Sequence, residues 1–460
     1  VRFMAKLSLI DYGFLLTESH HSPKHVGCMQ TFKLPPRKGS AWLRQMLAGL
    51  KEEKPGFPFN QRVSFKNPFQ PEWVRELNVD MDYHERHTVL PHPGDDEQLW
   101  KMASRLHSNL LDRERPLWEF HLIEGLSDRR FAFYIKIHHA MADGVTISRW
   151  VSESGAENPK DINSPAIWHG EKRRQRAKSK EPTYADLVAE GIKVFGGGVR
   201  TAMDMATLTV RLLQRRFLEG NRDITFPLSA PKTRFNVVPG AARNLTATEF
   251  ALDEVKAIAH DQEVTVNDVL LTICDLAVNR YFADKGEPLN EPLVVYMPVN
   301  LRTKQDDEGG NLVSLLQVRM SSSQEDPLLA LHQVSQSSVT AREVFSGFGR
   351  PAIQLYALTV ALLSLFEETL KLDKVLRPVT NLVISNVPGP PKTLYFRGAE
   401  SLRAYPISTL PPMTALNVTA NSYAGIMHVG LVAGRTAIPD LDLLTRHMDE
   451  VFAEIKELAG

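Results

Sequence analysis

FAFYIKIHHAMADG, residues 131–144, is the stretch from which both the fold and the site can be predicted. Its first nine residues alternate in a way that predicts a buried strand with two distinct faces. His139 continues the face that begins at Phe131, and His138 continues the opposite face. The two rings are therefore expected to point in opposite directions. This disfavours a zinc site built from both histidines, because adjacent strand residues do not converge easily on one ion.

The apolar face that carries His139 predicts a neutral imidazole in a dry cavity. A neutral imidazole with an available nitrogen can take a proton from a hydroxyl or a thiol. Asp143 and Gly144 follow where the chain must turn. The Asp143 carboxylate could orient the histidine, cap a helix that begins near Val145, or form a buried ion pair that fixes the loop. The alternative interpretation is a purely structural His-His pair at the end of a strand.

Residues 138–144 also fit the pattern HHxxxDG, the signature of a superfamily that includes chloramphenicol acetyltransferase, peptide-synthetase condensation domains and plant acyltransferases. Companion motifs lie elsewhere in the chain: PLW at 116–118, ND at 267–268, PVNLR at 298–302 and NLVISNVPGP at 381–390. This set closely resembles the bacterial wax ester synthase/acyl-CoA:diacylglycerol acyltransferase family, from about residue 7 to residue 431. The resemblance implies an α/β, two-domain chloramphenicol-acetyltransferase-like fold. Each domain would be a mixed sheet packed with helices, with an active-site tunnel between the domains.

The resemblance also implies roles for individual residues. His139 would be the general base, which removes the proton of an alcohol as its oxygen attacks a thioester carbonyl, with no covalent acyl-enzyme. His138 is expected to be structural. Asn267 is the first candidate for the oxyanion donor, and backbone amides near Gly144 are the alternative. Helix capping by Asn267 or Thr265 is the structural alternative for the ND motif.

Two more residues receive roles by the same analogy. In related acyltransferases the motif aspartate pairs with a distant arginine and holds the loop, and Arg302 in PVNLR is the matching position for Asp143. Trp118 is a core aromatic by default. The resemblance adds a substrate-binding role, in which Trp118 shapes the cavity near His139.

Length and charge limit the remaining choices. A chain of 460 residues suits two domains of roughly 200 residues each. We expect an N-terminal acyltransferase domain at 1–156, a basic linker with connecting helices at 157–230 and a C-terminal acyltransferase domain at 231–460. Equal numbers of basic and acidic residues, 54 of each, argue against a nucleic-acid partner. Cys28 and Cys274 are expected to be inert core residues of a cytoplasmic protein without a signal peptide.

No run reaches the roughly 20 apolar residues that a membrane-spanning helix needs. The best candidate, residues 355–366, is predicted to be a buried helix. Six of the nine residues at 172–180 are basic, and a helix with an apolar face is predicted from residue 184. This segment is either a solvated linker or an interfacial anchor for anionic lipid, at the inner membrane or at lipid inclusions.

The favoured function is transfer of a fatty acyl group from acyl-CoA, as a substrate, to a long-chain alcohol or to diacylglycerol. No cofactor and no metal are expected. The alternatives are a condensation-type enzyme that uses carrier-bound acyl groups and a non-catalytic lipid-binding scaffold. The NLVISNVPGP run and the lack of a carrier domain in these residues disfavour the first, and the intact HHxxxDG disfavours the second. A hydrolase is disfavoured because no GxSxG nucleophile elbow is present.

Overall fold

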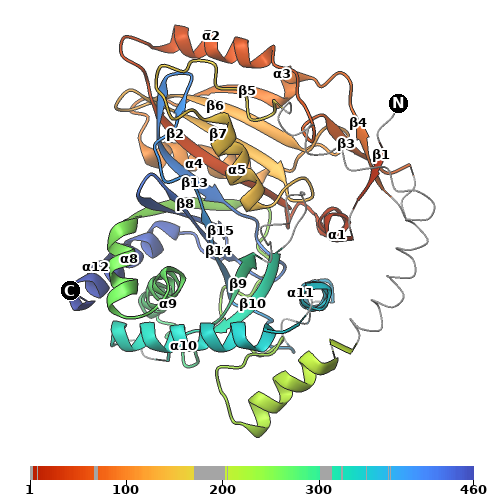
Figure 1. Cartoon of the computed structure of the whole chain (residues 1–460), viewed down its shortest axis with the longest axis vertical. Helices are drawn as coiled ribbons and strands as arrows, with labels where there is room; N and C mark the ends of the chain where they lie inside the picture. Colours follow the sequence, from red (N-terminus) through yellow and green to blue (C-terminus); the bar gives the residue numbers. More distant parts are fainter. Residues whose placement is uncertain are drawn as a thin grey trace.

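Two six-stranded sheets dominate the structure, a computed structural model, and a three-stranded sheet lies beside the first (Figure 1). The structure describes residues 4–7, 9–66, 71–169, 203–204, 206–300, 313–322, 325–348, 350–370, 372 and 375–459. The small sheet consists of β1 (Met4–Lys6), β4 (Glu72–Arg75) and β3 (Gln61–Ser64). The predicted α/β class with two sheet-containing halves is confirmed.

The first large sheet contains the predicted central strand. Its order is β12 (Tyr395–Phe396), β13 (Ala399–Ile407), β2 (His25–Lys33), β7 (Arg130–His138), β6 (Trp118–Leu126) and β5 (Glu85–Val89). β7 is buried on both faces, because α2 (Ser40–Lys51) and α5 (Gly144–Ser154) pack on one side and α4 (Asp96–Ser108) packs on the other. Double-sided burial explains why apolar residues occupy almost every position of the strand.

The second large sheet carries the other half of the core. Its order is β10 (Val313–Arg319), β9 (Val294–Asn300), β11 (Leu382–Pro388), β14 (Leu416–Tyr423), β15 (Ile426–Gly434) and β8 (Arg243–Ala251). One face is covered by α8 (Leu252–Asp261), α9 (Val266–Asp284), α10 (Pro327–Phe345) and α12 (Leu441–Ala459). The helical residues 206–213 and α11 (Arg350–Thr369) pack on the other face.

The two sheets are joined by an exchange of strands. β12 and β13 come late in the chain, yet they complete the first sheet, where β13 pairs antiparallel with β2. The predicted range 231–460 is therefore not self-contained, although the predicted domain boundaries themselves stay predictions. β13 also packs across β15, and a Cβ at Gly430 would lie only 1.9 Å from the Pro406 carbonyl oxygen. Glycine is required there because the two backbones touch.

Two predictions about helices have different outcomes. α9 begins at a capping box formed by Thr265 and Asp268, so Thr265 is the cap and Asn267 is not. The prediction that residues 355–366 form a buried helix is wrong in part, because Leu355, Leu362 and Phe366 of α11 are exposed. An apolar run in the sequence does not show whether protein or lipid covers the side chains. Within the described ranges, no helix combines the length and the apolar character needed to cross a bilayer.

Candidate active site

A cavity of about 370 Å³ lies between the two large sheets, and most of its lining is apolar. Its walls come from β2, β11, β14, α5, α11 and the loop after β13. The alternation along β14 turns Asn417, Thr419 and Asn421 towards the cavity, whereas Val418 and Ala420 face the core. His139, Asp143 and Gly144 of the motif all line this space. The end of β7 therefore delivers the motif to the junction of the two halves.

His139 is the first residue after β7. Its backbone N–H donates a hydrogen bond to the Lys24 carbonyl oxygen at 2.8 Å, and its ring stacks on Phe14 with 4.2 Å between ring centroids. Burial lowers the pKa of His139 to about 4, although the charge of Asp143 acts in the opposite direction. The imidazole is therefore neutral near pH 7. This is the protonation state that a general base requires.

His138 is fully buried and does not line the cavity. Its Nδ1 accepts a hydrogen bond from the Ala140 backbone N–H at 3.1 Å, so the proton of the neutral ring belongs on Nε2. Nε2 lies 3.4 Å from Oε1 of Glu18. The ring therefore ties the end of β7 to the residue that follows α1 (Leu9–Thr17).

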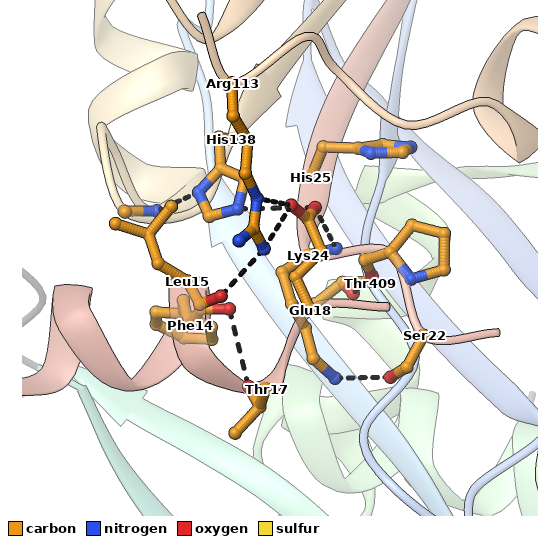
Figure 2. Close-up of polar contacts among 12 residues, drawn as sticks. Phe14, Leu15, Thr17, Glu18, Ser22, Lys24, His25, Arg113, His138 and Thr409 are labelled. Carbon is orange, nitrogen blue, oxygen red and sulfur yellow. Dashed lines mark hydrogen bonds and ion pairs between the residues drawn. The ribbon is translucent and has the colours of Figure 1, made fainter. Parts of the chain in front are cut away.

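Glu18 holds the elements around the motif together (Figure 2). Its Oε2 accepts hydrogen bonds from Nε and Nη2 of Arg113 at 3.1 and 3.0 Å, and its Oε1 accepts one from the Lys24 backbone N–H at 3.1 Å. Burial opposes the charge of Glu18, but the contacts with His138, Lys24 and Arg113 hold the pKa of the carboxyl at about 2. No role for Glu18 is predicted from the sequence. No local pattern could have indicated one, because Arg113 and His138 lie far away in the chain.

Asp143 is the N-cap of α5. Its Oδ1 accepts a hydrogen bond from the Thr146 backbone N–H at 2.8 Å. Of the three roles that the sequence left open, the structure shows the cap. Arg302 lies outside the described residues, so its ion pair with Asp143 stays a prediction. Gly144 begins the helix, where an added Cβ would make only an ordinary 3.8 Å contact with Val387.

The capping role of Asp143 can be tested with two variants that both remove the charge, only one of which keeps a side-chain oxygen for the hydrogen bond. Asp143→Ala is expected to lower the free energy of unfolding by about 1 kcal/mol, whereas Asp143→Ser, which keeps a capping oxygen, is expected to stay within a few tenths of wild type. Urea unfolding followed by circular dichroism measures both values. A loss of about 3–5 kcal/mol in both variants would mean instead that a buried ion pair dominates.

Asn267 lies in the first turn of α9, and its Oδ1 accepts a hydrogen bond from Nδ2 of Asn386 at 2.9 Å. Asn386 lines the cavity, whereas Asn267 does not. Among the described residues, the buried Oδ1 of Asn386 has no hydrogen-bond partner. The Asn386 amide therefore lines the cavity, and Asn267 contacts it from outside the lining. An oxyanion role for Asn267 stays a prediction, and the missed residue Asn386 lies within the NLVISNVPGP motif.

Trp118 is placed in the core of the first half instead of the cavity lining. It has no exposed surface, and its Nε1–H donates to the Phe59 carbonyl oxygen at 2.8 Å. Its ring stacks on those of His84 and Trp168. The predicted substrate-binding contact is therefore not seen, because a Trp ring that satisfies its N–H inside a packed core has no face left for a ligand.

The described residues include no group of three His, Cys, Asp or Glu side chains placed to hold a metal ion. Cys274 is buried in the core of the second half. Cys28 lines the cavity, and burial raises the pKa of its thiol to about 12. A thiol with such a pKa is not a ready nucleophile, which leaves the motif histidine as the reactive group that the cavity presents.

This arrangement defines a class. Two mixed sheets that enclose a cavity with an HHxxxDG histidine are typical of acyltransferases with the chloramphenicol-acetyltransferase-like fold. The first condensation domain of the CDA synthetase has this fold as well, with a TM-score of 0.58 at 15% identity over 100% of this chain and 96% of that one.

The chain belongs to the wax ester synthase/diacylglycerol acyltransferase family. The catalytic-domain model of that family matches residues 7–270, and its C-terminal-domain model matches residues 309–456. A probable diacylglycerol O-acyltransferase of Mycobacterium tuberculosis is 34% identical over 455 residues, 98% of each chain. The solved wax ester synthase/diacylglycerol acyltransferase of Marinobacter aquaeolei VT8 is 28% identical with a TM-score of 0.77, over 99% of this chain and 100% of that one. The protein is therefore an acyltransferase, and the resemblance seen in the sequence is confirmed.

Proposed function

We propose that this protein transfers a long-chain fatty acyl group from acyl-CoA to a long-chain alcohol, giving a wax ester, or to diacylglycerol, giving triacylglycerol. The observation that carries the proposal is a buried, neutral His139 on the wall of a largely apolar cavity. An apolar cavity suits two substrates with long hydrocarbon chains. The names of the relatives support the same pair of acceptors.

In the proposed reaction, a ring nitrogen of His139 removes the proton of the acceptor hydroxyl while the hydroxyl oxygen attacks the thioester carbonyl carbon. A C–O bond forms, and the carbonyl electrons move to the oxygen to give a tetrahedral oxyanion. The C–S bond then breaks as the carbonyl reforms, and the departing thiolate takes the proton back from His139. The histidine is regenerated, and no acyl-enzyme or cofactor is needed.

The oxyanion needs a hydrogen-bond donor that is already in place before the reaction. The Asn386 amide is a candidate because it lines the cavity and its Nδ2 carries a second proton besides the one that it donates to Asn267. Asn267 itself and the backbone amides near Gly144 remain the other candidates. His138 and Glu18 would act indirectly, by holding the end of β7 in position.

The cellular location of the protein is also a proposal. We propose a cytoplasmic protein that acts peripherally at the inner membrane or at lipid inclusions, since both acceptors are nearly insoluble in water. The basic run at 172–180 lies outside the described residues and stays a predicted anchor for anionic lipid.

The test is thiol release from palmitoyl-CoA with and without 1-hexadecanol or dioleoylglycerol, followed by chromatography of the lipid product. Release should depend on the acceptor and should yield ester in equal amount. Acceptor-independent release would indicate a thioesterase. No release, with palmitoyl transfer only from a carrier-bound thioester, would favour the condensation-type alternative.

A further inference from the structure

The outer side of α11 carries large apolar side chains beside the exposed Thr359 and Thr369, and Leu370 follows directly after the helix. Leu355, Leu362, Phe366 and Leu370 are 40%, 51%, 63% and 55% exposed. Their spacing of seven, four and four positions puts them on one stripe of a helix. A stripe of this kind normally faces the core of a protein, so its exposure calls for a physical reason.

The acidic side chains of the same helix point the other way. Glu367 is only 2% exposed, and Oε2 of Glu368 is buried. Burial lowers the pKa of Lys24 to about 8 and that of Arg243 to about 10, and the charge of Glu368 opposes both shifts. Glu368 therefore faces two buried cations. Besides the apolar residues that pack on the sheet, such as Tyr356 and Val360, the helix turns carboxylates inward and large apolar side chains outward, which is not the arrangement that water selects.

The cavity reaches the surface beside this stripe. Ala357, Ala361 and Ser364 of α11 line the cavity, and Ala361 is also exposed to solvent. Across the opening, Phe14 of α1 lines the same cavity, and its near neighbour Leu16 is 64% exposed. α1 and α11 lie on the same side of the molecule in Figure 1. We call the exposed apolar residues of this stripe the mouth face: Leu355, Leu362, Phe366 and Leu370.

We propose that the mouth face docks on a phospholipid surface, so that acceptor lipids pass from that surface into the cavity without crossing water. The inference rests on the proposed function, since it takes the acceptors to be water-insoluble lipids. Four partly exposed side chains offer roughly 400 Å², below the roughly 800 Å² per partner that a specific protein interface buries. Insertion into a lipid surface needs no such area, because each apolar side chain gains separately on leaving water.

The test variant is the triple substitution Leu362→Ser/Phe366→Ser/Leu370→Ser. Its matched control is Leu77→Ser/Val89→Ser/Leu458→Ser, which removes three exposed apolar side chains elsewhere. In flotation with vesicles of pure phosphatidylcholine, the test variant is expected to bind at least about tenfold more weakly than wild type, and the control is expected to bind like wild type. Neutral vesicles are used so that binding by the basic run at 172–180 contributes little. Equal flotation of all three proteins would overturn the proposal.

Activity gives a second readout. The ratio of the rate on vesicle-borne 1-hexadecanol to the rate on dissolved 1-butanol should fall about tenfold in the test variant and stay constant in the control. Because both rates come from one preparation, a misfolded fraction cancels from the ratio. A dimer that dissociates in the test variant, with unchanged flotation, would make the face a contact between two copies and refute lipid docking. If wild type transferred to neither alcohol, the proposed function would fail while flotation still tested the face.

Discussion

Replacing His139 with alanine is expected to lower the rate of acyl transfer about 10²–10⁴-fold, the range that general acid–base catalysis contributes. The mostly apolar lining of the cavity provides no obvious replacement base. The measurement is the initial rate of acceptor-dependent thiol release from palmitoyl-CoA, together with the urea midpoint to show that the variant is folded.

His138→Ala is the matched control, because its ring contacts Glu18 and the Ala140 backbone and does not line the cavity. We expect this variant to lose stability more than rate. Wild-type activity in folded His139→Ala would reject the general-base mechanism. Equal losses of rate in both folded variants would mean that the two rings do not have separate tasks.

Glu18→Ala is expected to lower the free energy of unfolding by about 1–3 kcal/mol, because hydrogen-bond donors lose a charged acceptor while the Arg113 side chain, 40% exposed, can still be solvated. The substitution leaves the Arg113 guanidinium, the His138 Nε2–H and the Lys24 backbone N–H without their shared acceptor. Denaturant unfolding at pH 7 measures the loss. Glu18→Gln, which keeps the shape and one acceptor oxygen, should fall between alanine and wild type.

The same carboxyl should give a defined pH dependence. Its folded pKa of about 2 lies below the ordinary value of 4.5. The stability that ionised Glu18 contributes is therefore complete above about pH 4.5 and is lost as the pH falls towards 2. The difference in unfolding free energy between wild type and Glu18→Ala should accordingly shrink from pH 6 to pH 3. A difference that stays constant over this range would show that Glu18 is not the group that titrates.

Individual strands and helix ends could be predicted because they depend on the pattern of neighbouring residues in the sequence. The alternation around His139 indicated β7 to within a residue. Thr265 was one of two candidates for a helix cap, with Asn267, and the structure shows that Thr265 is the cap. His139 was expected to lie in a cavity and it lines one, whereas the roles given to the motif residues stay predictions.

The parts that were missed depend on distant contacts. Glu18 gains its role only from Arg113 and His138, and a lone glutamate at the end of an apolar helix looks like an ordinary surface residue. Trp118 was assigned to the cavity by analogy, but the partners of its ring and N–H keep it in the core. The outward direction of large apolar side chains on α11 was not predicted, for a related reason. An apolar run shows that its residues avoid water, but it does not show whether protein or lipid surrounds them.

The pairing of β13 with β2 has a consequence for folding while the chain is being synthesised. Gly27 pairs with Ile407, so the first sheet needs a strand that the ribosome makes only after nearly all of the chain. Until then β2 has an open edge, of the kind that invites pairing with other chains. β7, which delivers His139, is the neighbour of β2 on its other side. The first sheet thus stays incomplete until β13 has been made, and no enzyme activity can arise before residue 407 has left the exit tunnel.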